Sequence, residues 1–148
     1  MKTKKSIQIL IAEDDDDDKL LIIKAFQKTL SKENITCVND GEELINYLNK
    51  TSNSENSLFP VPDIILLDLN MPRKDGKTTL QELKSHEIFR KIPVIIFTTS
   101  SLNEDIQMTY KMGTNSFITK PGNFKDLVKI TQEINNYWSN TVILPNKI

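Results

Sequence analysis

The stretch DIILLDLNMPRKDG, residues 63–76, carries the clearest structural signal in this chain of 148 residues. Its apolar run is continuous from Ile64 to Leu67, whereas a half-exposed strand would alternate apolar and polar residues. A short continuous run of this kind is typical of a parallel strand that is covered on both faces. The run ends at Asp68. The sequence therefore predicts a buried strand over 63–67 that delivers a carboxylate to one edge of a sheet.

Four similar apolar runs lie on either side of this stretch. They are short, nearly continuous and rich in Ile and Val: IQILIA (7–12), ITCV (35–38), IPVIIF (92–97) and SFI (116–118). Between the five runs lie segments whose apolar residues recur at the spacing of an α-helix. Because strands that alternate with helices form a parallel sheet with helices on both faces, we expect a doubly wound α/β domain with five parallel strands and five helices.

The five expected helices share apolar residues at helical spacing. They are 17–31, 41–50, 76–86, a fourth marked by Ile106 with Tyr110 and ended by Gly113, and a fifth running from Phe124 to Trp138. Between the second helix and the third strand, residues 51–62 form the one long expected loop. The ten residues 139–148 leave no room for a second domain, so we expect no output domain. The apolar residues among them indicate a tail that either folds back on the core or contacts another chain.

Composition excludes several classes of protein. The 19 Lys and Arg residues nearly balance 20 Asp and Glu residues, and a net charge of −1 argues against a nucleic-acid-binding domain. Apolar runs of four residues, such as 20–23 and 94–97, are far shorter than the ~20 residues that a membrane helix needs. The single Cys37 excludes an internal disulfide and a multi-thiolate metal site. We therefore expect a soluble cytoplasmic domain.

Polar side chains follow the expected strands where ligands of parallel sheets bind, beyond their carboxyl ends. Glu13 and Asp14 follow the first strand, Asp68 the third, Thr98 the fourth and Lys120 the fifth. Carboxylate and hydroxyl oxygens without His or Cys suit a hard cation such as Mg²⁺. An aspartate held ionised beside a cation and a lysine can act as a nucleophile. The pattern therefore predicts magnesium-dependent phosphoryl transfer.

Four motifs in this order resemble the receiver domains of two-component response regulators. They are ILIAEDD (9–15), DIILLDLNMPRKDG (63–76), PVIIFTTSS (93–101) and ITKP (118–121). The resemblance spans residues 5–138, followed by the tail 139–148. It implies the CheY-like, flavodoxin-like fold with strand order 2-1-3-4-5.

The resemblance assigns the acidic residues position by position. Asp68 resembles the phosphoacceptor aspartate of the family. Glu13 and Asp14 match the acidic pair that holds Mg²⁺, with Asp14 binding directly and Glu13 through water. Asp68 itself would be a further ligand, and Asn70 would contribute its backbone carbonyl.

The remaining motif residues are implied to bind and sense the phosphoryl group. Thr98 matches the hydroxyl that bonds this group, and Lys120 matches the lysine that bonds the acceptor or its phosphate. The resemblance also implies that Pro121 is the cis-proline often found at this position. Phe117 occupies the aromatic switch position. Because a phenylalanine has no hydroxyl, switching by Thr98 and Phe117 would rest on ring packing.

Segments outside the site motifs, including YWSNTVILP at 137–145, are similar to the corresponding segments of the stand-alone regulators that accompany bacterial phytochromes. This likeness implies a single-domain response regulator that takes its phosphoryl group from a sensor histidine kinase of the phytochrome type or from a phosphotransfer protein. It also implies a homodimer. Its chemistry would be limited to its own phosphorylation and dephosphorylation, with no nucleic acid or membrane as partner.

One feature departs from the family, and two other functions compete. Asp14 to Asp18 are consecutive aspartates. We interpret Asp16 to Asp18 as the start of a helix, where acids complement the helix dipole. A hydrolase of the haloacid dehalogenase type also uses a strand-end aspartate with Mg²⁺, but it needs a second acid where this chain has Asn70. A receiver that docks partners without being phosphorylated is the other alternative.

Overall fold

The structure is a computed structural model that describes residues 7–52 and 58–145. The expected loop over 51–62 and the expected tail over 139–148 lie partly outside these residues, as do the first two positions of the expected domain 5–138. Within the described part of the chain, no helix is long and apolar enough to cross a membrane.

A single sheet of five parallel strands forms the centre of the molecule, in the order β2-β1-β3-β4-β5. Its strands are β1 (Ile9–Ala12), β2 (Ile35–Val38), β3 (Ile64–Leu67), β4 (Val94–Thr98) and β5 (Ser116–Thr119). The expected fold class and strand order are confirmed. Ala12 pairs with Leu67 in the register of β1 and β3, so these two strands end at the same level.

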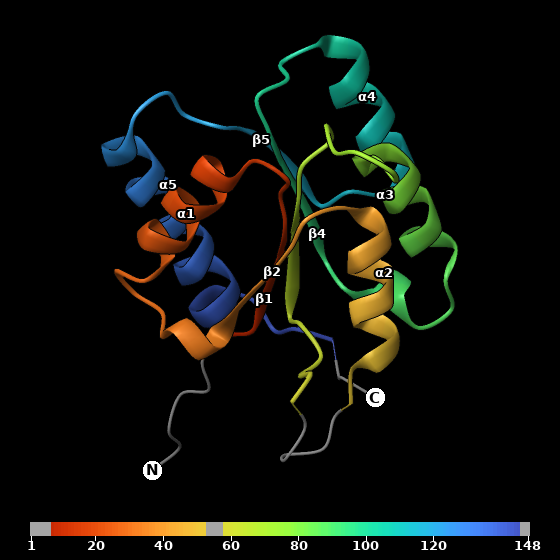
Figure 1. Ribbon diagram of the computed structural model, residues 1–148, viewed down its shortest axis with the longest axis horizontal. Coiled ribbons are helices and arrows are strands. Elements are labelled where there is room, and N and C mark those ends of the chain that lie inside the picture. The colour runs from red at the N-terminus through yellow and green to blue at the C-terminus, as the bar shows by residue number, and fades with distance from the viewer. Residues whose placement is uncertain (1–6, 53–57, 146–148) are drawn as a thin grey trace.

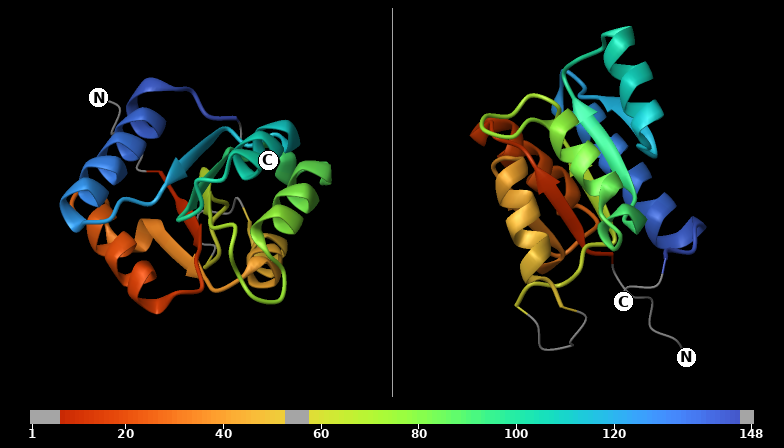
Figure 2. Two further views of the ribbon diagram at one scale, coloured as in Figure 1. Left: turned by 90° about the horizontal axis from the view of Figure 1, so that it is seen from above. Right: turned by 90° about the vertical axis from the view of Figure 1, so that its right-hand side faces the viewer.

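Helices cover both faces of the sheet (Figures 1 and 2). They are α1 (Asp16–Phe26), α2 (Gly41–Lys50), α3 (Gly76–Ser85), α4 (Asn103–Met112) and α5 (Phe124–Asn136), with two short 3₁₀ helices, η1 (Lys32–Asn34) and η2 (Phe89–Lys91), and a short π-helix, η3 (Tyr137–Thr141). In Figure 1, α1 and α5 lie on one side of the sheet, and α2, α3 and α4 lie on the other.

Strand side chains alternate between two hydrophobic clusters, one on each face of the sheet. Leu10 packs with α2 and α3 through residues such as Leu44 and Leu80. Its neighbour Ile11 packs on the opposite face with Ile22 of α1 and residues of α5. Because the central strands β1, β3 and β4 are buried on both faces, they are apolar almost throughout, which is why their runs are continuous.

Two expected helices differ from the structure. The first does not reach residue 31 but ends at Phe26, although the Leu30 N–H still bonds the Phe26 carbonyl and Leu30 is buried. The face of α4 that is buried carries Asp105 and Thr109, while Tyr110 is exposed. This polar face is stabilised because Asp105 has partners on neighbouring elements, which the apolar pattern does not show. Gly113 ends α4 in the left-handed conformation, as predicted.

Candidate functional site

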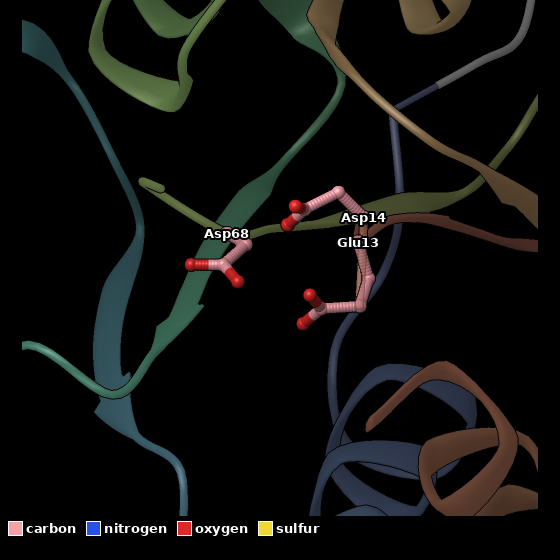
Figure 3. A group of neighbouring side chains, drawn as sticks. All are labelled: Glu13, Asp14 and Asp68. Atoms are coloured by element: carbon pink, nitrogen blue, oxygen red, sulfur yellow. The ribbon is translucent and has the colours of Figure 1, made fainter. Parts of the chain in front are cut away.

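Three carboxylates come together where β1 and β3 end (Figure 3). Glu13 and Asp14 follow β1, and Asp68 follows β3, where its N–H bonds the Ala12 carbonyl at 3.1 Å. One oxygen from each carboxylate lies within 4.8 Å of the others. Glu13 and Asp68 are buried at 1% and 6% exposure, whereas Asp14 is exposed. The predicted convergence of these residues is therefore observed.

This group fits a hard divalent cation. All the donors are carboxylate oxygens, and buried anions packed this closely repel one another unless a positive charge lies among them. In Figure 3 the three side chains surround a common space. Asn70 lies in the turn after β3, where its N–H donates to Asp68 Oδ1 at 3.2 Å. The role expected for the Asn70 carbonyl stays a prediction.

Lys120 supplies the positive charge of the site. It follows β5, and its N–H donates to the Thr98 carbonyl at 2.7 Å. Its ammonium bonds Glu13, and it bonds one oxygen each of Asp68 and Asp18 at 3.0 Å. Burial acts to lower the pKa of Lys120, but the hydrogen bond to Glu13 and the charge of Asp68 outweigh it and raise that pKa. The lysine is therefore held in its charged form.

Glu13 has the most perturbed carboxyl group of the site. Burial is the main cause, and the nearby charge of Asp68 adds to it, while the hydrogen bond from Lys120 opposes both. Together they raise the pKa of Glu13 from 4.5 to about 7. A carboxyl group perturbed in this way beside a specific charge partner is typical of functional sites.

The loop after Asp68 is held by close packing against the start of α3. Asp75 caps this helix by accepting the Thr78 N–H at 2.8 Å. A Cβ atom at Gly76 would lie 2.3 Å from the Asp68 carbonyl oxygen, a distance that side chains do not tolerate. Arg73, within the same loop, has a positive φ of 62°, which is uncommon for a residue other than glycine. The backbone that presents Asp68 is thus tightly constrained.

Thr98 is the last residue of β4, and Phe117 lies within the neighbouring strand β5, where it pairs with Ile96. Thr98 is fully buried, and its hydroxyl accepts the Ser100 N–H at 3.4 Å. Phe117 is half-buried and packs against the cluster on the α2 and α3 side. Its N–H donates to the Tyr110 hydroxyl at 3.2 Å. The switch roles of Thr98 and Phe117 stay predictions.

The structure corrects one expectation. The peptide bond before Pro121 is trans, not cis. The trans form is the more stable isomer of such bonds by about 0.5–1 kcal/mol, and with it Lys120 already reaches the carboxylates.

The interpretation of the aspartate run as a helix start is confirmed, because α1 begins at Asp16 and Asp15 caps it by accepting the Asp18 N–H at 2.9 Å.

Sequence reasoning missed two other sets of contacts. Asp18 bonds Lys120 as well, which no sequence signal indicated. On the other side of the sheet, Asp105 of α4 accepts the Ser100 hydroxyl at 2.6 Å and pairs with Lys77 at 2.5 Å.

Comparison with known proteins gives consistent matches. Residues 9–132 match the protein family described as response regulator receiver domain. Response regulator Rcp1 of Synechocystis sp. is 36% identical over 137 residues, which cover 93% of this chain and 92% of Rcp1.

Solved structures agree with the sequence matches. The phosphorylated cyanobacterial phytochrome response regulator RcpA superposes with a TM-score of 0.85 at 35% identity, covering 96% of this chain and all of that one. The Mn²⁺-bound form of Rcp1 gives a TM-score of 0.78 at 36% identity, with 95% and 99% of the two chains covered.

Proposed function

Because the chain belongs to the family of response regulator receiver domains, we propose that Asp68 accepts a phosphoryl group from a histidine kinase in the presence of Mg²⁺. The chain is a receiver domain of two-component signalling, in which phosphorylation of an aspartate is typical. The observation that carries the assignment to Asp68 is its contact with Lys120, inside a group of carboxylates that fits a cation.

The cation would be held by Glu13, Asp14 and Asp68, together with the Asn70 carbonyl. When bound, it supplies positive charge that neutralises the oxygens of the transferring phosphoryl group. The Mn²⁺-bound form of Rcp1 supports a divalent metal site in a close relative. The absence of His and Cys from the ligand set supports Mg²⁺ for this chain.

In the proposed reaction, the phosphoryl group is transferred from a histidine nitrogen of the kinase to a carboxylate oxygen of Asp68. A carboxylate oxygen of Asp68 attacks the phosphorus atom of a phosphohistidine, so that a P–O bond forms and the P–N bond breaks. The electron pair of the broken bond stays on the imidazole nitrogen. The Lys120 ammonium and the Thr98 hydroxyl donate hydrogen bonds to the new phosphoryl oxygens, and repacking of Phe117 conveys the change to the surface near α4 and β5.

The relatives suggest the partners. RcpA is a phytochrome response regulator, which supports a phytochrome-type histidine kinase or a phosphotransfer protein as phosphoryl donor for this chain. We extend the proposal to a cytoplasmic receiver domain over residues 5–138 that contacts a second copy through the tail 139–148. Ile143 supports this contact, because it is an apolar residue with 99% of its surface exposed.

Intact mass measurement tests the proposed chemistry. Incubation with Mg²⁺ and a small acyl phosphate should add one phosphoryl group, about 80 Da, and neither metal-free protein nor Asp68→Asn should gain it. Beryllofluoride, which mimics the phosphoryl group without being hydrolysed, should bind the wild type even if the adduct is short-lived. Binding of neither group would contradict the proposal. Repeated turnover of a generic phosphate ester would instead favour the hydrolase alternative.

A further inference from the structure

The ammonium group of Lys120 is shared between the phosphoacceptor site and helix α1. It has three N–H donors, and three carboxylates contact it. Two of these, Glu13 and Asp68, belong to the site described above. The third, Asp18, lies in the first turn of α1 and has no part in the proposed metal or phosphoryl chemistry.

Asp18 is held in a fixed position close to the acceptor. Its N–H bonds the carboxylate of Asp15, which caps the helix. Asp18 Oδ2 and Asp68 Oδ2 each lie 3.0 Å from the same Lys120 nitrogen, so these two oxygens can be at most about 6 Å apart. The Asp18 side chain is 40% exposed, whereas that of Lys120 is 9% exposed. Asp18 therefore approaches the buried site from its solvent side.

We propose that Asp18 is a positioning residue that draws the Lys120 ammonium toward α1 and so weakens its hold on the phosphoryl group of Asp68. This inference rests on the proposed function. A phosphoryl group carries about −1.5 to −2 charge and needs N–H donors from the lysine. Asp18 competes for those donors, and its own negative charge repels the phosphoryl oxygens.

The other aspartates of the run are placed differently. Asp16 pairs with Lys19 at 3.6 Å, and its side chain is 97% exposed. Asp17 is also exposed on the same helical turn. Asp18 and Lys120 both line a small cavity of about 180 Å³ between α1 and the start of α5. This space allows the Asp18 carboxylate to be replaced by an amide without repacking of the core.

Beryllofluoride affinity at saturating Mg²⁺, measured by calorimetry, tests the role of Asp18. Asp18→Asn should bind about two- to fivefold more tightly than the wild type, the range expected for a partly exposed ion pair. Asp18→Glu, which restores the charge, should return toward the wild type. Asp17→Asn is the matched control, because it removes the same charge from the same turn, and it should change the affinity by less. Salt should reduce the difference between Asp18→Asn and wild type.

The outcomes separate this inference from the proposed function. Weaker binding by Asp18→Asn would show that Asp18 supports the site, and an affinity equal to that of Asp17→Asn would show that the ion pair has no specific effect; either result overturns the inference alone. If the wild type neither binds beryllofluoride nor gains a phosphoryl group, the proposed function is overturned, and the inference with it. Thermal melting of each variant confirms that the fold is retained.

Discussion

Glu13 shows how the fold sets the chemistry of a single residue. It follows a buried strand, so its carboxyl group lies at 1% exposure, where water cannot stabilise the charge. Lys120 offsets part of that cost through its hydrogen bond, but it is shared with two other carboxylates. The net result is a pKa raised to about 7, mainly by burial. A proton and a cation therefore compete for the same group near neutral pH.

We predict that the affinity for Mg²⁺ falls as the pH falls through 7. The raised pKa means that, without a cation, the protonated form of Glu13 is favoured below about pH 7, and the cation requires the ionised form. The affinity should drop about tenfold between pH 8 and pH 6. Titration calorimetry at several pH values measures this.

Glu13→Gln provides the control for this pH dependence. The amide cannot ionise, so the variant should bind Mg²⁺ more weakly than the wild type at pH 8 and with little change down to pH 6. An affinity of the wild type that is constant over this range would show that Glu13 is already ionised in the metal-free protein.

The positions of the site residues could be predicted because each follows a strand. Glu13, Asp68 and Lys120 come directly after β1, β3 and β5, and the carboxyl ends of parallel strands lie at one edge of a sheet. Asp18 could not be predicted in this way. Its contact with Lys120 joins residues 102 positions apart, and it depends on the packing of α1 against α5, which no local pattern encodes.

At the scale of elements, the start of helix α3 packs directly against the loop that follows Asp68. The Gly76 N–H bonds the Leu69 carbonyl at 3.0 Å, one residue after Asp68. Because a Cβ atom at position 76 would collide with backbone atoms rather than with a flexible side chain, the close approach requires glycine. The helix therefore fixes the position of the Asp68 backbone as well as covering the sheet.

Gly76→Ala should consequently impair both stability and the site. We expect a loss of about 1–3 kcal/mol in the free energy of unfolding, the usual cost of overpacking. Because the backbone of Asp68 must move, beryllofluoride binding should also weaken. Chemical denaturation and calorimetry measure the two effects. Gly122→Ala is the matched control, since a Cβ atom there would have no neighbour within 4 Å; equal effects of the two variants would contradict this explanation.

Helix α4 is joined to its neighbours by polar contacts. Asp105 links Lys77 of α3 to Ser100 in the loop after β4, and both partners lower the pKa of Asp105. The sequence pattern marked this helix by Ile106 and Tyr110, of which Ile106 is half-buried and Tyr110 is exposed, because periodicity detects apolar residues only. A helix face that is buried through an ion pair and hydroxyl groups gives no such signal. This is why the existence of α4 could be predicted and its buried polar face could not.

Lys77→Met should loosen α4 without unfolding the domain. We expect hydrogen exchange of the α4 amides to become about three- to tenfold faster, because Asp105 loses its ion-pair partner. The wild type should show the same change in acid, since a carboxyl group with a lowered pKa loses its stabilising contact as the pH falls below its ordinary value of 3.8.

The control for this variant is Lys74→Met. Lys74, in the loop before α3, pairs with Glu82 of α3 at 2.9 Å. The Lys74→Met substitution therefore removes an ion pair that does not involve α4. Exchange in α4 that responds equally to both substitutions would mean that the contact between Lys77 and Asp105 has no specific role.

At the scale of the whole molecule, two neighbouring apolar residues of the tail after α5 differ in their exposure to solvent. Leu144 packs against the core cluster on the α1 and α5 side and also lines a cavity of about 640 Å³ with residues such as Leu48 and Ile92. Ile143, its neighbour, is 99% exposed. Of the two expectations for the tail, folding back on the core thus applies to Leu144. Contact with another chain remains a proposal, for which Ile143 is the candidate.

Substitution of these two neighbours should therefore separate folding from assembly. Leu144→Ala should lower the free energy of unfolding by about 1 kcal/mol, less than a fully buried leucine would cost, because Leu144 is half-buried. Ile143→Lys should leave that stability unchanged and shift the sedimentation profile from dimer toward monomer, since burying a lysine charge in an apolar contact is unfavourable. If Ile143→Lys sediments like the wild type, the exposed isoleucine does not form the dimer contact, and the proposed interface must lie elsewhere on the domain.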